Sequence, residues 1–209
     1  DLQETHFHKS KDIFSQIRTY PTFMTSLNLW LPTCTFALSF SIFGIFFIGG
    51  PYIAVKVFNL SPTVMGIYLA SPALGYVLGN ILVSRIANLV STKNLMVFGS
   101  LILVLGPCSS LLLSNFFLHP LSFYLPILIM TFGSGIIWPA SNAEIVKAIP
   151  HLAGSASGLG SAIMTLMSSF AAFLTGIYIE ESNPMDFVCY FLILVGLLSF
   201  FSSLCSRSK

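Results

Sequence analysis

The longest segments of this sequence contain no charged residues. Only 8% of the 209 residues are Asp, Glu, Lys or Arg, against roughly 25% in an ordinary soluble domain. Five stretches carry no formal charge: 19–55, 57–84, 94–143, 148–179 and 187–206. The third is more than twice the roughly 20 residues that cross a bilayer, and Pro120 lies near its middle, so we expect it to hold two helices. A soluble core of this length could not bury so much apolar surface.

The sequence lacks the residues that several classes of enzyme and binding protein require. There is no HExxH sequence for zinc, no GxxxxGK[ST] loop for a nucleotide, and no Asp inside an apolar stretch for an aspartyl protease. No basic cluster with interleaved aromatic residues indicates a nucleic-acid partner. The four cysteines, which have no CxxC spacing, are predicted to be small buried apolar residues rather than disulfides or metal ligands. They are Cys34, Cys108, Cys189 and Cys205.

A serine between two glycines, Ser134, superficially resembles the nucleophile of a rhomboid-type membrane protease. Such a serine needs a histidine within hydrogen-bond reach to take its proton. None of the four histidines lies inside a predicted membrane span; they are His6, His8, His119 and His151. The sequence therefore predicts helix packing for Ser134, and no catalytic residue, metal site or cofactor.

The predicted fold is an all-α membrane protein of six transmembrane helices. The expected spans are about 28–54, 64–84, 95–114, 120–141, 153–178 and 187–205 within a membrane domain of 27–206. Residues 1–26 form a polar, mixed-charge lead-in or interdomain linker, and residues 207–209 form a short tail. Because the sequence begins with Asp1 rather than Met, we expect a processed product or a piece of a longer chain.

Basic residues are distributed unequally between the two ends of the predicted spans. An even number of spans places both termini on one side of the membrane. That side holds eight basic residues, and the other side holds Lys56 alone. The eight are Lys9, Lys11, Arg18, Arg85, Lys93, Lys147, Arg207 and Lys209. Since cytoplasmic loops carry the excess of Lys and Arg, both termini are predicted to be cytoplasmic.

Small residues recur at helix-packing spacing in two of the spans. The second span contains Gly75 and Gly79, and the fifth contains Gly154, Gly158 and Ala162. In lipid, helices associate through close backbone approach at such residues. These glycines are therefore predicted to serve packing, and a helix as poor in bulk as the fifth could also let a neighbour slide or rock against it.

Polar and aromatic side chains inside the spans are candidates for the lining of a cavity. The predicted lining residues are Tyr68, Ser71, Thr131, Phe132, Met164 and Ser168, with Tyr76, Asn80 and Phe170 as further candidates. The 20 phenylalanines could form an apolar wall for hydrophobic small molecules, or face lipid and neighbouring helices. Trp138, near the end of the fourth span, is also a candidate for the lining, but it is interpreted first as an anchor at the membrane interface.

Three ordered segments resemble one family. Residues 133–143 with 149–158 resemble the tenth and eleventh helices of the Bcr/CflA drug-resistance transporters, a subfamily of the major facilitator superfamily. Residues 50–52 with 57–62 resemble the end of the seventh helix and the following loop, and residues 78–85 resemble the end of the eighth. The likeness covers about residues 20–205 in order. Residues 87–92 depart from it, because family members often carry a further basic residue and a glycine there.

The resemblance implies that this chain is the carboxyl-terminal half of a twelve-helix transporter, with substrate held between two halves. The family's proton-coupling residues lie mainly in the amino-terminal half, which accounts for the uncharged spans here. We therefore expect part of a proton-coupled multidrug efflux transporter of a bacterial inner membrane. The expected partners are membrane lipid, hydrophobic small molecules and an amino-terminal six-helix half, in the same or a separate chain.

Arg85, at the end of the second span, is expected either to pair with an acidic partner as the inner gate closes or simply to reflect membrane topology. Two alternatives to the half-transporter remain open: a non-transporting membrane scaffold or degenerate gene product, and a six-span carrier that works as a homodimer.

Overall fold

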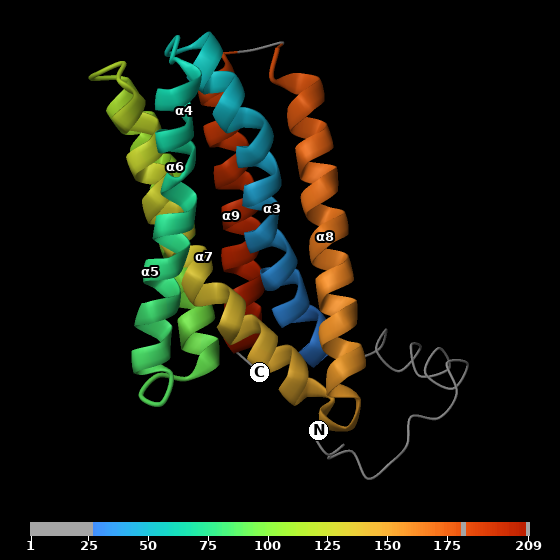
Figure 1. Cartoon of the computed structure of the whole chain (residues 1–209). Helices are drawn as coiled ribbons and strands as arrows, with labels where there is room; N and C mark the ends of the chain where they lie inside the picture. Colours follow the sequence, from blue (N-terminus) through green and yellow to red (C-terminus); the bar gives the residue numbers. More distant parts are fainter. Residues whose placement is uncertain (1–26, 181–182, 208–209) are drawn as a thin grey trace, which may run out of the picture.

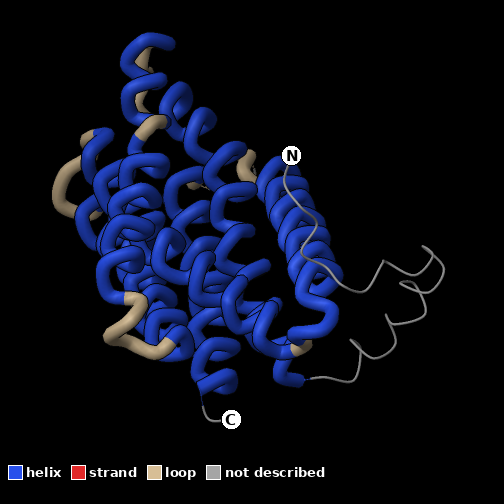
Figure 2. The backbone as a smooth tube through the Cα atoms, turned by 60° about the horizontal axis from the view of Figure 1, so that its bottom comes forward, coloured by secondary structure: helices blue, strands red, loops and turns tan. Residues whose placement is uncertain are grey.

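The structure is a computed structural model that describes residues 27–180 and 183–207. The expected lead-in of 1–26 and the last two residues lie outside the described residues. All regular structure in the described part is helical, as Figure 2 shows. The elements are α3 (Leu27–Lys56), α4 (Pro62–Leu69), α5 (Ser71–Ile86), α6 (Thr92–Ser114), α7 (Pro120–Ala148), η1 (Pro150–Leu152), α8 (Ala153–Tyr178) and α9 (Pro184–Arg207).

Within the described residues, six helical segments are long and apolar enough to cross a membrane, and α4 and α5 together form the second of them. The predicted all-α membrane fold is therefore confirmed. The helix breaks at Ala70 because Pro72 has no backbone N–H to donate to the carbonyl of Tyr68. The N–H groups of Ala70 and Ala73 instead bond three residues back, which tightens the chain locally.

The fourth long helix, α7, differs from the expected span of 120–141. It continues through Glu144 and Lys147 to Ala148, so both charged residues lie on a helix rather than in a loop. Residues 142–148 contain no Gly or Pro, and the first helix-breaking residue is Pro150. At its start, His119 caps the helix, because its Nδ1 accepts a hydrogen bond from the N–H of Leu121 at 3.2 Å.

Two helices, α3 and α7, lie at the centre of the bundle (Figure 1). α5 packs against α7, and α8 packs against α3, while α6 and α9 pack against each other and against α7 and α3 respectively. Each helix of the first triplet (α3, α4–α5, α6) thus meets a helix of the second triplet (α7, α8, α9). Contacts between two triplets of helices are consistent with the inverted three-helix repeats that occur within half of a facilitator fold. The core between the triplets includes Phe46, Leu103 and Tyr124, each at most 1% exposed.

The two ends of the bundle differ in charge. α3 begins and α9 ends at the same end, which is the lower end in Figure 1. Arg85, Lys93 and Lys147 lie at that end, because α5 and α7 end there and α6 begins there. At the opposite end, the described basic residue is Lys56. The unequal distribution of basic residues therefore persists in the folded chain.

Two helical segments are far less buried than the central ones. In their most apolar windows, 22% of Pro62–Ile86 and 17% of Ala153–Tyr178 are buried, against 61% for α3 and 67% for α7. Each of these outer helices therefore packs within the chain along one narrow face, and most of its apolar surface is available to lipid or to another protein.

The cysteines only partly match their predicted environment. No disulfide joins the four thiols, and Cys189 is buried, as expected. Cys34 and Cys108 are partly buried and Cys205, near the end of α9, is exposed, so the prediction that all four are buried is wrong for Cys205 and only partly met by Cys34 and Cys108.

Candidate functional site

An aromatic cluster joins the two central helices with α5. We define it as Phe36, Phe40 and Phe43 of α3, Tyr76 of α5 and Trp138 of α7. The indole ring of Trp138 lies 4.7 Å from the ring of Phe40, 5.2 Å from Phe43 and 4.6 Å from Tyr76, between ring centroids. Residues 36, 40, 43 and 47 are three or four apart, so they share one face of α3. Along this face exposure grows from Phe36, which is 9% exposed, to Phe47, which is 65% exposed.

Trp138 is not an interfacial anchor, and that interpretation of the sequence is wrong. Because α7 continues to Ala148, Trp138 lies about three turns before its end. Its ring meets Phe40 and Phe43 about halfway along α3. The indole Nε1 is buried and has no hydrogen-bond partner among the described residues. A donor left unpaired in this way costs free energy.

The chemistry of the cluster suits uncharged or lipophilic ligands. Aromatic faces offer large apolar area and attract other rings or cations through their quadrupoles. None of its five members carries a formal charge. The cluster can therefore hold a molecule by contact area and stacking.

Two of the predicted lining residues, Tyr68 and Ser71, lie on either side of the break between α4 and α5. The ring of Tyr68 stacks on Tyr124, with centroids 5.0 Å apart and planes 29° apart. Tyr124 is held in turn, because its hydroxyl donates to the carbonyl of Gly50 at 2.8 Å. The hydroxyl of Ser71 is buried and has no partner among the described residues.

Thr131 and Phe132 of α7 lie where α5 and α6 pack against this helix. The Thr131 hydroxyl donates to carbonyls of its own helix, at 3.0 Å to Ile127 and 3.1 Å to Leu128. Its side chain is 1% exposed. Phe132 is half-buried and packs against a cluster that includes Val83 of α5. Both residues therefore contact protein in this chain.

Met164 and Ser168 lie on the face of α8 that meets α3. Met164 packs against the cluster that contains Phe36, at the edge of the aromatic cluster. Ser168 is 9% exposed and lies against Gly44 of α3, where a Cβ atom would stand 2.2 Å from the Ser168 carbonyl oxygen. None of the six predicted lining residues thus belongs to the aromatic cluster, and Met164 packs beside its member Phe36.

The sequence prediction included two members of the cluster, Tyr76 and Trp138, and did not single out Phe40 or Phe43. The signal available was the three-and-four spacing of the phenylalanines along one face of α3. That spacing alone does not show whether the face meets lipid or protein.

The four predicted packing glycines fall into two pairs with opposite surroundings. Gly75 and Gly79 allow close approach of α5 to α7: a Cβ atom would lie 2.2 Å from the carbonyl oxygen of Leu128 at Gly75, and 2.3 Å from that of Phe132 at Gly79. Gly154 and Gly158 of α8 have no atom within 4 Å of a Cβ atom built on them. Close packing at the second pair would require a partner outside the described residues.

Gly154 and Gly158 belong to a continuous line of small residues, which we call the α8 stripe. Its members are spaced three or four apart and thus share one face of the helix, and all but the half-buried Ala172 are exposed. They are Gly154, Gly158, Ser161, Thr165, Ser169, Ala172 and Gly176. A separate exposed face carries bulky apolar side chains, namely Leu166, Phe170, Phe173 and Ile177. The α8 stripe therefore allows another helix to approach closely, whereas the bulky face keeps a neighbour farther away.

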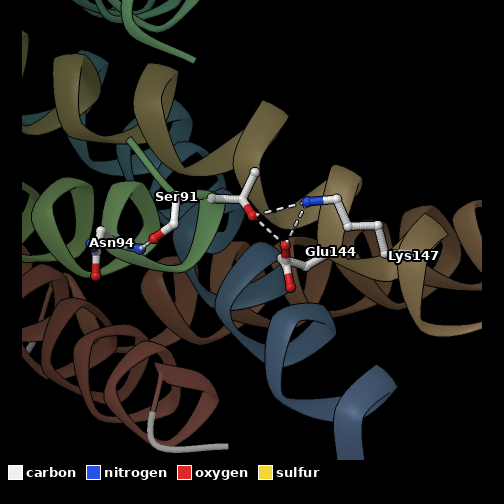
Figure 3. A network of polar contacts seen from close by, with 5 residues as sticks. Ser91, Asn94, Glu144 and Lys147 are labelled. Atoms are coloured by element: carbon white, nitrogen blue, oxygen red, sulfur yellow. Dashed lines mark hydrogen bonds and ion pairs between the residues drawn. The ribbon is translucent and has the colours of Figure 1, made fainter. Parts of the chain in front are cut away.

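Charged residues at the lower end form a small polar network, drawn in Figure 3. Glu144 accepts hydrogen bonds from the Thr92 hydroxyl and from Lys147 Nζ, the latter at 3.0 Å. Lys147 Nζ also donates to Thr92 Oγ1 at 3.2 Å. The network ties the start of α6 to the end of α7. Arg85 is exposed in the last turn of α5, and no ion pair of Arg85 occurs within the described residues.

The serine-nucleophile alternative has no geometric support in the described part of the chain. Ser134 is fully buried in α7, and its hydroxyl has no hydrogen-bond partner among the described residues. His119 lies about four helical turns away along the same helix. Residues 27–180 and 183–207 also contain no group of three or more His, Cys, Asp or Glu that could hold a metal.

Comparison with known proteins identifies the family of this fold. The sequence model described as Major Facilitator Superfamily matches residues 2–172. A relative from Bacillus subtilis (strain 168), described as "Uncharacterized MFS-type transporter YdgK", is 24% identical over 155 residues. The match covers 73% of this chain and 38% of the relative, so the chain spans well under half of that relative's length. Since the family match covers most of a chain that folds as six transmembrane helices, the chain belongs to the major facilitator superfamily.

Proposed function

We propose that this chain forms the carboxyl-terminal half of a proton-coupled efflux transporter of the Bcr/CflA type, in a bacterial inner membrane. The aromatic cluster contributes one wall of the cavity for hydrophobic small molecules. An amino-terminal six-helix half, in the same or a separate chain, supplies the opposite wall and the groups that carry protons. The chain acts in transport and performs no catalysis of its own.

The α8 stripe is the observation that carries this proposal. A helix surrounded by lipid gains nothing from a line of small residues, whereas a helix that packs closely against another helix does. Within the described residues, no atom lies within 4 Å of a Cβ atom built on Gly154, Gly158 or Gly176 of the stripe. The bulky face of Leu166, Phe170 and Phe173 lies beside the stripe. We therefore assign the stripe to contact with the amino-terminal half and the bulky face to lipid.

The uncharged spans support a division of labour between the halves. Ion-coupled membrane proteins keep ionisable groups near the bilayer midplane. The aromatic cluster has no Asp, Glu, Lys, Arg or His, and the charge-free stretch 94–143 runs through Trp138. Lipophilic substrates would thus contact this half, and proton exchange would take place in the other. Tyr68, Ser71, Thr131, Phe132, Met164 and Ser168 support the wall from behind and at its edges.

The orientation proposed from charge places the lower end of Figure 1 in the cytoplasm. Arg85, Lys93 and Lys147 lie there, with Lys56 at the other end. In this orientation Arg85 reaches the inner surface, where it is available to pair with an acidic residue of the amino-terminal half as the inner gate closes.

Reconstituted transport tests the proposal. The chain is expressed alone, and then together with the six-helix segment encoded immediately upstream, in cells loaded with a fluorescent hydrophobic dye. We expect uncoupler-sensitive dye export only from the combined halves. Strong export by this chain alone, abolished by an uncoupler, would overturn the proposal. The absence of any upstream six-span segment would favour the scaffold or the homodimer.

Crosslinking tests the assigned contact face directly. In a cysteine-free background, a cysteine at Thr165 on the α8 stripe should crosslink to the amino-terminal half. A cysteine at the adjacent Leu166, which is 69% exposed on the bulky face, is the matched control and should not. A product of twice the mass of this chain, formed from Thr165 in the absence of the other half, would instead support the homodimer.

A further inference from the structure

Four helix ends enclose a polar pocket at the lower end of the bundle. We call it the Lys93 pocket; its volume is about 190 Å³. The ends of α3, α6, α7 and α9 meet there, so the pocket lies at the ends of the membrane-spanning segments and not in their middle. It is lined by Asn28, Leu31, Lys93, Glu144, Lys147, Ala148 and Ser206.

The pocket has an excess of positive charge that its own carboxylate does not neutralise. Glu144 already accepts from Lys147 at 3.0 Å and from the Thr92 hydroxyl, so this pair is close to neutral. Lys93, in the first turn of α6, forms no ion pair within the described residues. The pocket therefore holds one cationic group more than it has anionic groups.

The pocket also holds uncharged groups that can donate hydrogen bonds. Ser206 of α9 is only 6% exposed and lines the pocket, so its hydroxyl can donate to a ligand oxygen there. Asn28 offers its side-chain amide. Lys93 lies in the first turn of α6, and the N-terminus of a helix favours anions.

We propose that the Lys93 pocket binds the phosphodiester headgroup of an anionic phospholipid. The cationic and donor groups of the pocket suit the oxygen atoms of a phosphate group. Because the pocket lies at the ends of the membrane-spanning helices, we assign this phosphate to a lipid rather than to a soluble molecule. The pocket opens among the ends of membrane-spanning helices, which is the depth at which the headgroups of a bilayer lie. Basic pockets between helix ends are suited to such headgroups.

Lipid retention measured by native mass spectrometry tests this assignment. The full chain is reconstituted in equal amounts of phosphatidylglycerol and phosphatidylcholine, and the lipids that stay bound are identified. We expect phosphatidylglycerol to be retained preferentially. Lys93→Gln should reduce the ratio of the two lipids about fivefold, the factor typical for one basic residue near a membrane surface. Ser206→Ala should reduce it by a smaller factor, because it removes one donor and no charge.

Lys56→Gln is the matched control, since Lys56 is exposed at the opposite end of α3. It should leave the ratio unchanged. Equal retention of the two lipids by the unaltered chain, or an equal loss in Lys56→Gln and Lys93→Gln, would overturn the proposal, because either result reflects overall charge alone. Millimolar inorganic phosphate is added in a parallel sample. If it abolishes the preference, the pocket binds free phosphate and the lipid assignment is wrong.

Discussion

Replacing one glycine on each of two helices tests whether the same spacing motif plays different roles in this bundle. In Gly79→Ala, the new Cβ atom would lie 2.3 Å from the carbonyl oxygen of Phe132 and 3.0 Å from the Cα of Gly135. Both contacts are to backbone atoms, so no side-chain rotation can relieve them. α5 must move away from α7 along the whole contact. In Gly158→Ala on α8, the added methyl group meets no atom within 4 Å.

Gly79→Ala should lower stability, whereas Gly158→Ala should not. Overpacking of a tight contact costs about 1–3 kcal/mol, and the better helix propensity of alanine returns up to about 1 kcal/mol. Gly79→Ala should therefore lower the free energy of unfolding by about 1–2 kcal/mol. Gly158→Ala should leave it unchanged or raise it by up to about 1 kcal/mol.

Unfolding of the chain in mixed micelles of dodecyl maltoside and increasing SDS measures this difference. Tryptophan fluorescence is a suitable signal, because Trp138 contacts Phe40 and Tyr76 only in the folded bundle. If Gly79→Ala and Gly158→Ala unfold at the same SDS fraction, the close approach of α5 to α7 is not a source of stability and the reasoning fails.

Three further substitutions extend the test to the other contacts. Tyr124→Phe removes the hydroxyl that donates to Gly50 at 2.8 Å, and it should lower the free energy of unfolding by about 1 kcal/mol in the same assay; an unchanged value would show that the bond adds no stability. Ser134→Ala removes a buried hydroxyl without a partner, so stability should stay equal or rise by up to about 1 kcal/mol, and any measured loss would reveal an unseen role. In the combined transporter, Trp138→Phe should reduce dye export, since it shrinks the ring that contacts Phe40 and Tyr76 in the aromatic cluster; unchanged export would contradict a role of the cluster in binding.

Much of the fold could be predicted from composition alone. The charge-free stretches predicted six membrane helices, because a charged side chain is costly in hydrocarbon and backbone polar groups there must be satisfied within a helix. The family resemblance was equally accessible in residues 133–158. Helix ends were predicted less well, because α7 continues beyond the membrane-length segment into residues whose propensity allows it.

The sequence by itself determined which residues share a helix face, since that follows from 3.6 residues per turn. It could not determine which face meets which helix. Gly75 and Gly79 have the same spacing as Gly154 and Gly158, but only tertiary packing buries the first pair and leaves the second open. Likewise, the aromatic cluster and the Thr92–Glu144 contact unite residues from separate helices. Their meeting depends on how the two helix triplets pack, which no local pattern encodes.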